Sequence, residues 1–403
     1  MVDTHDGKDG TMATGDVMPV TGAWRPGDDV GHRQFFTFAI DRRFAVDSGA
    51  TLTDVTVAYE TWGRLAPDAS NAVLVCHAWT GESHAAGSAG RGHSSPGWWD
   101  AMIGPGRPID TDKWFVVCPN VLGGCQGTTG PASFVPGTTK PYGSQFPVIT
   151  IRDMVRVQAR LADHLGIASW HTVFGGSMGG MQVLEWAITY PERVRGIVPI
   201  ATCMQSTAQQ IAWGAIGRRA IGLDPRWRGG DYYDAEPGDG PAEGLSIARM
   251  VAQVTFRSDN VFTERFGRAM THRAELGDRF GLWQQFEVEQ YLDHHGRKLG
   301  HRFDTNSYLL IGKAMDLHDV GRQRGHLEAA MSRIKAPCLS IGISSDMLYP
   351  TYQQRQIVEM LGSIGGQAGY IEIDSPHGHD AFLINLDQLA DPIADFLEVR
   401  KLP

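Results

Sequence analysis

The sequence predicts an α/β protein built on a mostly parallel, doubly wound sheet with a helical insertion. Short, uninterrupted apolar runs recur along the chain, and such runs are typical of parallel strands buried on both faces. Helical patterns separate several of these runs, and strands that alternate with helices favour a parallel sheet. The runs expected to be strands are AVLVCHA (72–78), WFVVCPN (114–120), HTVFGG (171–176), GIVPIAT (196–202), PCLSIGISSD (337–346) and YIEIDS (370–375).

The beginning of the chain divides into a leader and a strand region. Residues 1–32 are rich in Gly, Asp and Thr and show no hydrophobic period, so we interpret them as a flexible leader. From Arg33 onwards, the segments RQFFTFAI (33–40) and TLTDVTVAYETWG (51–63) alternate apolar and polar residues. This alternation is typical of half-buried antiparallel strands, so a hairpin is expected at one edge of the sheet.

The segment TIRDMVRVQARLADHLG (150–166) carries the signals of a complete helix. Thr150 is a favourable N-cap residue, and glycine, here Gly166, commonly follows the last turn of a helix. Between them, apolar side chains recur at helical spacing and would share one face. These side chains are Met154, Val157, Leu161 and Leu165.

The alternation of strands and helices stops between residues 205 and 324. Amphipathic helical stretches such as STAQQIAWGAIGRRAIG (206–222) and LSIARMVAQVTFR (245–257) follow one another there. We interpret residues 205–324 as a helical lid inserted into an α/β core of residues 33–204 and 325–403. Its apolar positions also suggest a homodimer surface. Those positions are Ile211, Trp213, Ile216 and Ile221.

Composition excludes several classes of function. The formal net charge of the 403 residues is -9, and no Lys- or Arg-rich stripe is present, which argues against a nucleic-acid surface. No signal peptide and no apolar run of ~18 residues is visible, so a cytoplasmic location without membrane contact is expected. The five cysteines lack metal-binding spacing and are expected to be reduced core thiols, with no metal site. They are Cys76, Cys118, Cys125, Cys203 and Cys338.

The stretch TVFGGSMGGMQ (172–182) places Ser177 among glycines, between an expected strand and an expected helix. Small flanking residues permit the sharp turn of a nucleophile elbow, which presents a serine hydroxyl above the sheet of an α/β-hydrolase fold. The free N–H groups and the dipole at the helix N-terminus favour an alkoxide or oxyanion. The alternative is a Gly-rich turn with an incidental serine. A phosphate-binding loop is excluded, because the Gly-Lys-Ser/Thr ending is missing.

A serine nucleophile needs a base, and in this fold the order along the chain is Ser, then Asp or Glu, then His. Asp346 ends the expected strand at 337–346, where a carboxylate can orient an imidazole. The next strand is followed by PHGHDAF, which offers His377 and His379. The residue pattern predicts a Ser-His-Asp triad but does not distinguish the two histidines.

An oxyanion hole in this fold combines two backbone N–H groups. One belongs to the residue after the nucleophile, here Met178, and the other to a loop that follows an earlier strand. The segment CHAWTGESH (76–84) is that loop, and Trp79 is the expected second donor because the turn begins after it. Trp79 also has a simpler interpretation as an aromatic wall of the pocket.

Several longer segments resemble the homoserine O-acetyltransferases of methionine biosynthesis. The resemblance extends from about residue 33 to residue 398, and its strings are more specific than the elbow alone. The segments are HAWTGESH (77–84), GWWD (97–100), NVLGGCQGTTGPAS (120–133), YGSQFPVITIRD (142–153), GGSMGGMQVLEW (175–186), GGDYY (229–233), RFDTNSYLL (302–310) and GHDAF (378–382).

The resemblance implies a triad of Ser177, Asp346 and His379, since the family motif reads Gly-His-Asp. It also implies that Arg257 and Asp380 bind the carboxylate and ammonium groups of L-homoserine. Acetyl-CoA would be a co-substrate rather than a bound cofactor. The implied reaction is ping-pong, with an acetyl-serine intermediate. Alternatives are transfer of succinyl instead of acetyl, serine as the acceptor, or a plain esterase or thioesterase.

Overall fold

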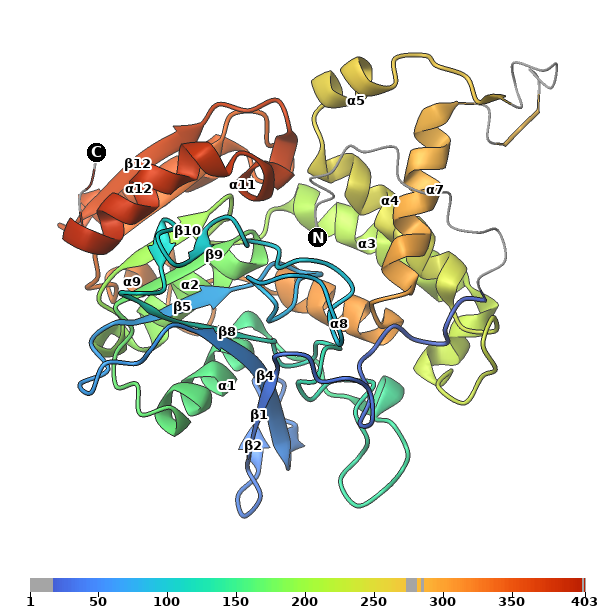
Figure 1. Ribbon diagram of the computed structural model, residues 1–403, viewed down its shortest axis with the longest axis horizontal. Coiled ribbons are helices and arrows are strands. Elements are labelled where there is room, and N and C mark those ends of the chain that lie inside the picture. The colour runs from blue at the N-terminus through green and yellow to red at the C-terminus, as the bar shows by residue number, and fades with distance from the viewer. Residues whose placement is uncertain (1–16, 273–280, 284–285, 401, 403) are drawn as a thin grey trace.

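The computed structural model of the protein describes residues 17–272, 281–283, 286–400 and 402. Its centre is an eight-stranded sheet with the order β1-β4-β8-β5-β9-β10-β11-β12 (Figure 1). From β8 to β12 along this order all neighbours are parallel, whereas β4 runs antiparallel to both β1 and β8. The strands are β1 (Gln34–Phe38), β4 (Val55–Trp62), β5 (Ala72–Cys76), β8 (Phe115–Pro119), β9 (Thr172–Gly176), β10 (Ile197–Ile200), β11 (Cys338–Ile343) and β12 (Ala368–Ile373).

The antiparallel edge expected from the N-terminal alternation is formed by β1 and β4. Between them the chain makes a separate two-stranded sheet from β2 (Phe44–Ala45) and β3 (Thr51–Leu52). Another short pair, β6 (Ile103–Gly104) and β7 (Ile109–Asp110), lies between β5 and β8 in the sequence. The edge is therefore a hairpin whose connection carries its own small sheet.

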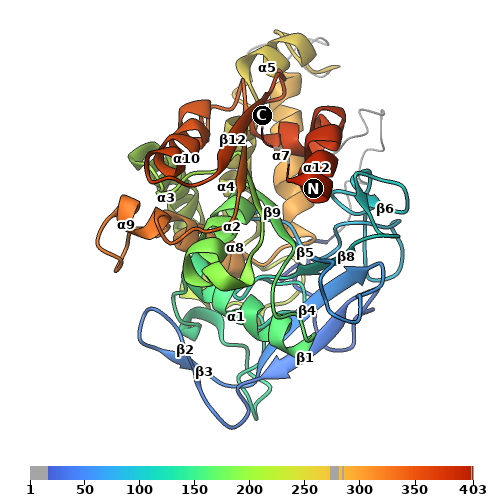
Figure 2. The same cartoon turned by 90° about the vertical axis from the view of Figure 1, so that its left-hand side faces the viewer.

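Alternate residues of the buried strands face two separate hydrophobic cores. On β5, Leu74 and Cys76 belong to the core covered by α1, α2 and α10, whereas Val73 and Val75 belong to the core covered by α12. Figure 2 shows α10 and α12 on opposite sides of β12. The predicted doubly wound, mostly parallel sheet is thus confirmed. The helices of the core are α1 (Ile151–His164), α2 (Met178–Thr189), α9 (Leu327–Met331), α10 (Thr351–Ser363), α11 (Ala381–Ile384) and α12 (Leu386–Val399).

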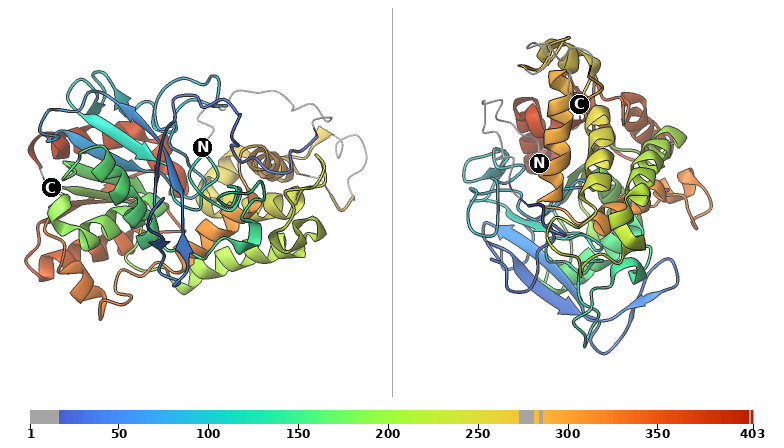
Figure 3. Two further views of the ribbon diagram at one scale, coloured as in Figure 1. Left: turned by 90° about the horizontal axis from the view of Figure 1, so that it is seen from below. Right: turned by 90° about the vertical axis from the view of Figure 1, so that its right-hand side faces the viewer.

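A group of helices lies between β10 and β11 in the sequence and beside the sheet in space (Figure 3). These helices lie within residues 205–324, the segment expected to be a lid. The boundaries of the lid at 205 and 324 stay a prediction. Within it, α4 packs against both α3 and α7. The helices are α3 (Ala208–Leu223), α4 (Ala242–Phe256), α5 (Asp259–Arg265), α7 (Glu287–Gly300) and α8 (Thr305–Asp316).

The expected dimer surface on α3 needs correction. Ile221 is 0% exposed because it packs into the core, and Trp213 lines a cavity. Only Ile211 and Ile216 of the four apolar positions are exposed. A helical pattern predicts which face of a helix is apolar, but it does not predict what covers that face. In the structure, α4 covers α3 on one side and α8 covers it on another.

The described part of the segment expected to be a flexible leader is packed against the protein. Gly22 N donates to Phe303 O, and Trp24 N donates to Cys125 O. The Thr21 hydroxyl donates to Asp304 Oδ1 at 2.8 Å. Residues 17–32 therefore form an arm that crosses from the helical segment to the core, and the rest of the expected leader, residues 1–16, lies outside the described residues.

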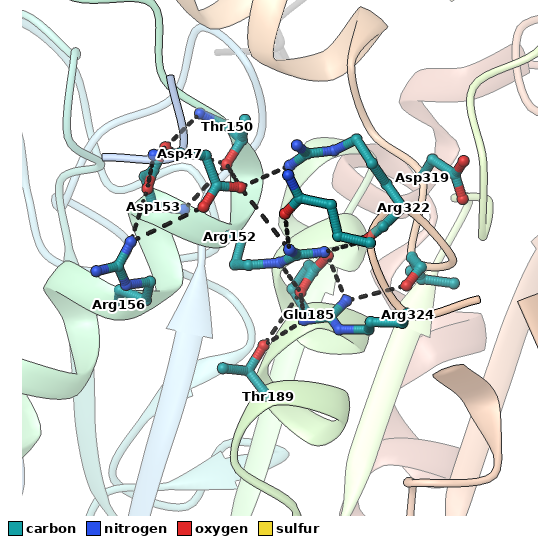
Figure 4. Close-up of polar contacts among 12 residues, drawn as sticks. Asp47, Thr150, Arg152, Asp153, Arg156, Glu185, Thr189, Asp319, Arg322 and Arg324 are labelled. Carbon is teal, nitrogen blue, oxygen red and sulfur yellow. Dashed lines mark hydrogen bonds and ion pairs between the residues drawn. The ribbon is translucent and has the colours of Figure 1, made fainter. Parts of the chain in front are cut away.

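An ion-pair network joins the end of the helical segment to the core (Figure 4). Arg324 contacts both carboxylate oxygens of Glu185 on α2, at 3.0 and 2.7 Å. Burial alone would raise the pKa of Glu185, but the hydrogen bond and charge of Arg324 outweigh it and lower the pKa. Arg322 binds Asp47 at 2.6 Å. The chain is therefore anchored to the helix that follows Ser177.

All five cysteines are free and buried, as the sequence predicts. No helix in the described part of the chain combines the length and the apolar character that a bilayer span requires.

Candidate active site

Ser177 lies at a sharp turn between β9 and α2. Its backbone angles are φ 58° and ψ -123°, a conformation with positive φ that L-residues seldom adopt. The glycines around it are required by close contacts, since a Cβ on Gly179 would lie 2.2 Å from Cys76 O and one on Gly175 would lie 2.4 Å from the backbone of Gly179. The strand, strained serine and helix form the nucleophile elbow expected from the sequence.

The structure places His379, and not His377, against Asp346. His379 Nδ1 lies 2.7 Å from Asp346 Oδ2, and both side chains are buried. The other oxygen of Asp346 accepts backbone N–H bonds from Leu348 and Tyr349, each at 2.8 Å. Asp346 follows β11, and His379 lies in a 3₁₀ turn (Gly378–Asp380) that follows β12. The carboxylate therefore fixes the imidazole with Nδ1 toward it and Nε2 away from it.

The Nε2 atom of His379 is buried and has no hydrogen-bond partner among the described residues. His379 and Ser177 line the same cavity, so this nitrogen is available to the serine hydroxyl or to a ligand. Burial alone would lower the pKa of His379, but the charge and hydrogen bond of Asp346 raise it above the ordinary value of 6.5. Asp346 thus stabilises the imidazolium that forms when His379 takes a proton.

This pKa predicts the pH dependence of the first chemical step. His379 acts as a base only when neutral, so the rate of acyl-enzyme formation should rise with pH through a pKa above 6.5. Asp346→Asn removes the charge that raises the pKa and should move this limb to lower pH. Stopped-flow measurement of acyl-enzyme formation between about pH 5 and 9 tests both statements. An unchanged limb in Asp346→Asn would show that another group controls the step.

The expected oxyanion donors follow two neighbouring parallel strands, β5 and β9. Met178 is the first residue of α2, and Trp79 lies in the loop after β5 that lines the cavity. Among the described residues, neither backbone N–H has a hydrogen-bond acceptor. The Trp79 ring stacks on Tyr308 with ring centroids 4.2 Å apart. Trp79 therefore lines the cavity as its simpler interpretation predicts, and its role as an oxyanion donor stays a prediction.

The cavity lies between the carboxyl ends of the strands and the helical segment. It has about 1100 Å³ of empty space, part of which is open to solvent. Its floor contains Ser177 and the 3₁₀ turn of His379, and α3, α4 and α8 supply its walls. The placement of ligand space at the carboxyl ends of parallel strands is typical of α/β proteins.

Arg257 and Asp380, expected from the resemblance to bind an amino acid, are neighbours. Arg257 Nη2 lies 3.7 Å from Asp380 Oδ2, and the two side chains are 9% and 10% exposed. Asp380 lines the cavity, whereas Arg257 is not among the lining residues. Arg257 thus pairs with a carboxylate that lines the cavity.

Sequence reasoning missed Arg249, which does line the cavity. Arg249 lies on α4, is 7% exposed, and forms no ion pair with any residue that the structure describes. Burial lowers its pKa, and the charge of Asp380 acts in the opposite direction. The sequence contains a signal that could have identified Arg249. This cation lies on the apolar face of an amphipathic helix, beside Ala248 and Ala252.

One group of side chains has the residue types of a metal site. His84 Nδ1 lies 2.9 Å from Glu60 Oε2, and His93 Nε2 lies 3.6 Å from Glu60 Oε1. However, the two imidazoles stack face to face, with centroids 3.8 Å apart and planes 9° apart. A ring nitrogen donates its lone pair within the ring plane, and one ion cannot lie in two parallel planes. The group therefore fits a buried hydrogen-bond cluster better than a shared metal.

The fold and the site define a class of protein. The family model described as alpha/beta hydrolase fold matches residues 71–385. Together with the elbow and the Asp346–His379 pair, this match identifies an enzyme of the α/β-hydrolase fold.

Comparison with similar proteins shows to which family within this class the chain belongs. A homoserine O-acetyltransferase of Carboxydothermus hydrogenoformans is 50% identical over 353 residues, which cover 88% of this chain and 92% of that protein. The crystal structure of homoserine O-acetyltransferase from Bacillus anthracis matches with a TM-score of 0.83 at 30% identity, covering 92% of this chain and 98% of that one. The crystal structure of esterase E22 matches with a TM-score of 0.82 at 31% identity, covering 91% and 99%. The chain belongs to the homoserine O-acetyltransferase family.

Proposed function

We propose that the protein transfers an acetyl group from acetyl-CoA to the side-chain hydroxyl of L-homoserine through an acetyl-serine intermediate. The observation that carries this proposal is a single cavity that contains Ser177, His379, Arg249 and Asp380. The first two residues serve acyl transfer, and the last two offer opposite charges to a zwitterionic acceptor. The family supports the same reaction, because its members are named for it.

In the first half-reaction, His379 Nε2 takes the proton of the Ser177 hydroxyl while the oxygen attacks the thioester carbonyl carbon. The negative charge on the carbonyl oxygen is held by the backbone N–H groups of Trp79 and Met178. When the tetrahedral intermediate collapses, the C–S bond breaks and His379 returns the proton to the thiolate. CoA leaves as the thiol, and Ser177 carries the acetyl group.

In the second half-reaction, His379 removes the proton of the homoserine hydroxyl, and this oxygen attacks the acetyl-serine carbonyl. The bond to Ser177 Oγ breaks, and His379 gives its proton back to the serine. The products are O-acetylhomoserine and free enzyme. Water at ~55 M competes for the same ester, so transfer requires a positioned acceptor with a high effective molarity.

The charges in the cavity support homoserine binding in one orientation. Arg249 presents its guanidinium to the acceptor carboxylate, and Asp380 accepts hydrogen bonds from the ammonium group. Arg257 Nη2 lies 3.7 Å from Asp380 Oδ2, so Arg257 holds the carboxylate of Asp380 in place. The role that the resemblance gives to Arg257 is therefore divided between two arginines.

The same charges favour an acetyl over a succinyl donor. Arg249 and His379 are the basic side chains among the cavity-lining residues, and Asp316 and Asp380 are the acidic ones. With Arg249 engaged by the acceptor and His379 by catalysis, no further described cation lines the cavity to bind a succinyl carboxylate. An acetyl group has no such requirement.

The location and assembly of the protein are further parts of this proposal. The reaction uses acetyl-CoA and an amino acid, which favours the cytoplasm. The homodimer expected from the sequence would use exposed apolar residues of α3 and α4, such as Ile211, Ile216 and Ile247, which are 38%, 50% and 48% exposed.

Product analysis tests the proposed reaction. The protein is incubated with homoserine or serine and with acetyl-CoA or succinyl-CoA, and the ester is identified by mass spectrometry. O-acetylhomoserine is the expected main product. Release of CoA at a rate that does not respond to homoserine, with free acetate as the product, would identify an esterase or thioesterase instead.

The acceptor site has its own prediction. Arg249→Gln should leave CoA release from acetyl-CoA intact, because the acetyl group does not need the guanidinium. Loss of a charged hydrogen bond in a buried site costs about 2–4 kcal/mol, so kcat/KM for homoserine should fall roughly 30- to 1,000-fold. Stopped-flow CoA release separates the two half-reactions. If Arg257→Gln shows this pattern and Arg249→Gln does not, the two arginines exchange roles.

A further inference from the structure

One wall of the active-site cavity carries two polar side chains that the proposed mechanism does not use. Trp213 on α3 and Asp316 at the end of α8 both line the cavity that contains Ser177. Asp316 lies close to the residue that follows Trp213, because a Cβ on Gly214 would lie 2.9 Å from Asp316 Oδ1. Both residues therefore belong to the part of the wall where α3 meets α8.

The tryptophans that line the cavity differ in whether their indole N–H groups form hydrogen bonds. Trp79 Nε1 donates to Tyr308 O at 3.2 Å, and Trp98 Nε1 donates to Glu82 O at 2.9 Å. Trp213 Nε1 is also buried, but it has no acceptor among the described residues. A buried donor without an acceptor is unfavourable, so this position favours a ligand that brings one.

Asp316 offers the complementary group. Its side chain is 8% exposed, and Arg218 at 2.5 Å is its only ion-pair partner in the described part of the chain. A carboxylate has about four acceptor positions, so one cation leaves acceptor capacity toward the cavity. The wall thus offers a donor from Trp213 and an acceptor from Asp316.

We propose that Trp213 and Asp316 bind the pantetheine arm of acetyl-CoA through its two secondary amides. The indole N–H donates to the carbonyl oxygen of one amide, and the Asp316 carboxylate accepts from the N–H of the other. This inference rests on the proposed function, because it takes acetyl-CoA as the donor. A trans amide points its carbonyl oxygen and its N–H in opposite directions, so a donor and an acceptor on one wall match different amides of the arm. The charged groups of homoserine match Arg249 and Asp380 instead.

The experiment compares two thioesters in Trp213→Phe. This variant keeps an aromatic ring in the wall and removes the N–H. Acetyl-CoA contains the amides, and S-ethyl thioacetate contains none. The ratio of kcat/KM for acetyl-CoA to that for S-ethyl thioacetate, measured as O-acetylhomoserine formation, should fall about tenfold. The KM for homoserine checks that the cavity is still formed.

Trp98→Phe is the matched control, because its N–H is already bonded within the protein. Its donor ratio should stay at the wild-type value. A Trp213→Phe ratio equal to that of the wild type would overturn the inference, whether both donors keep their rates or lose them together. A wild-type protein that forms no O-acetylhomoserine from acetyl-CoA would instead contradict the proposed function, and the inference with it.

Discussion

Ser177→Ala is expected to abolish acyl-enzyme formation and acyl transfer while the protein remains folded. Ser177 Oγ is the only protein atom that bonds to the acetyl group in the proposed mechanism. Removal of a triad serine reduces kcat by about 10⁶-fold in a well-studied hydrolase, which indicates the scale of the loss. Alanine fits the same space, since the residue is 5% exposed and its neighbours are glycines and Met178.

Intact-protein mass spectrometry after mixing with acetyl-CoA checks this expectation. The wild type should gain one acetyl group, and Ser177→Ala should gain none. A thermal melt of both proteins serves as the control for folding. An acetyl adduct that persists in Ser177→Ala would place the nucleophile elsewhere.

The two histidines after β12 should differ by several orders of magnitude in their effect. His379→Ala removes the base from both half-reactions, so kcat should fall at least 10³- to 10⁴-fold, as for other triad members. His377→Ala should have a mild effect, because its side chain neither contacts Asp346 nor lines the cavity. Steady-state formation of O-acetylhomoserine measures both variants. If His377→Ala proves the more damaging change, the base lies two residues upstream.

Much of the sheet could be predicted because buried strands and capped helices are specified locally. The helix expected at 150–166 is α1, and its start forms a capping box in which Thr150 and Asp153 bond to each other's backbone N–H. The N-cap and the apolar period stand in the sequence itself. No distant contact is needed to predict such an element.

Local patterns also predicted that most of the candidate catalytic residues lie together, because the ends of parallel strands meet at one edge of the sheet. They could not choose between His377 and His379. That choice depends on Gly378, whose φ is 70° and whose missing Cβ allows contact with the backbone of Phe256 and Arg257. The turn is set by α4, which is more than a hundred residues away along the chain.

The remaining errors share one physical origin. The N-terminal arm is fixed by hydrogen bonds to Phe303 and Cys125, and Trp213 is turned inward where α3 meets the cavity. Arg249 lines the same cavity because α4 covers it. In each case a tertiary contact decides the environment of a residue, and a single sequence does not contain the list of such contacts.

The central claim is that one acetyl group passes from CoA to Ser177 and then to homoserine. A pulse–chase with isotopically labelled acetyl-CoA follows this path directly: the protein is labelled, freed of CoA, and then mixed with homoserine. The account predicts that the label is first found on the peptide containing Ser177 and then in O-acetylhomoserine. A label that never appears on Ser177, or that leaves it only as free acetate, would contradict the account.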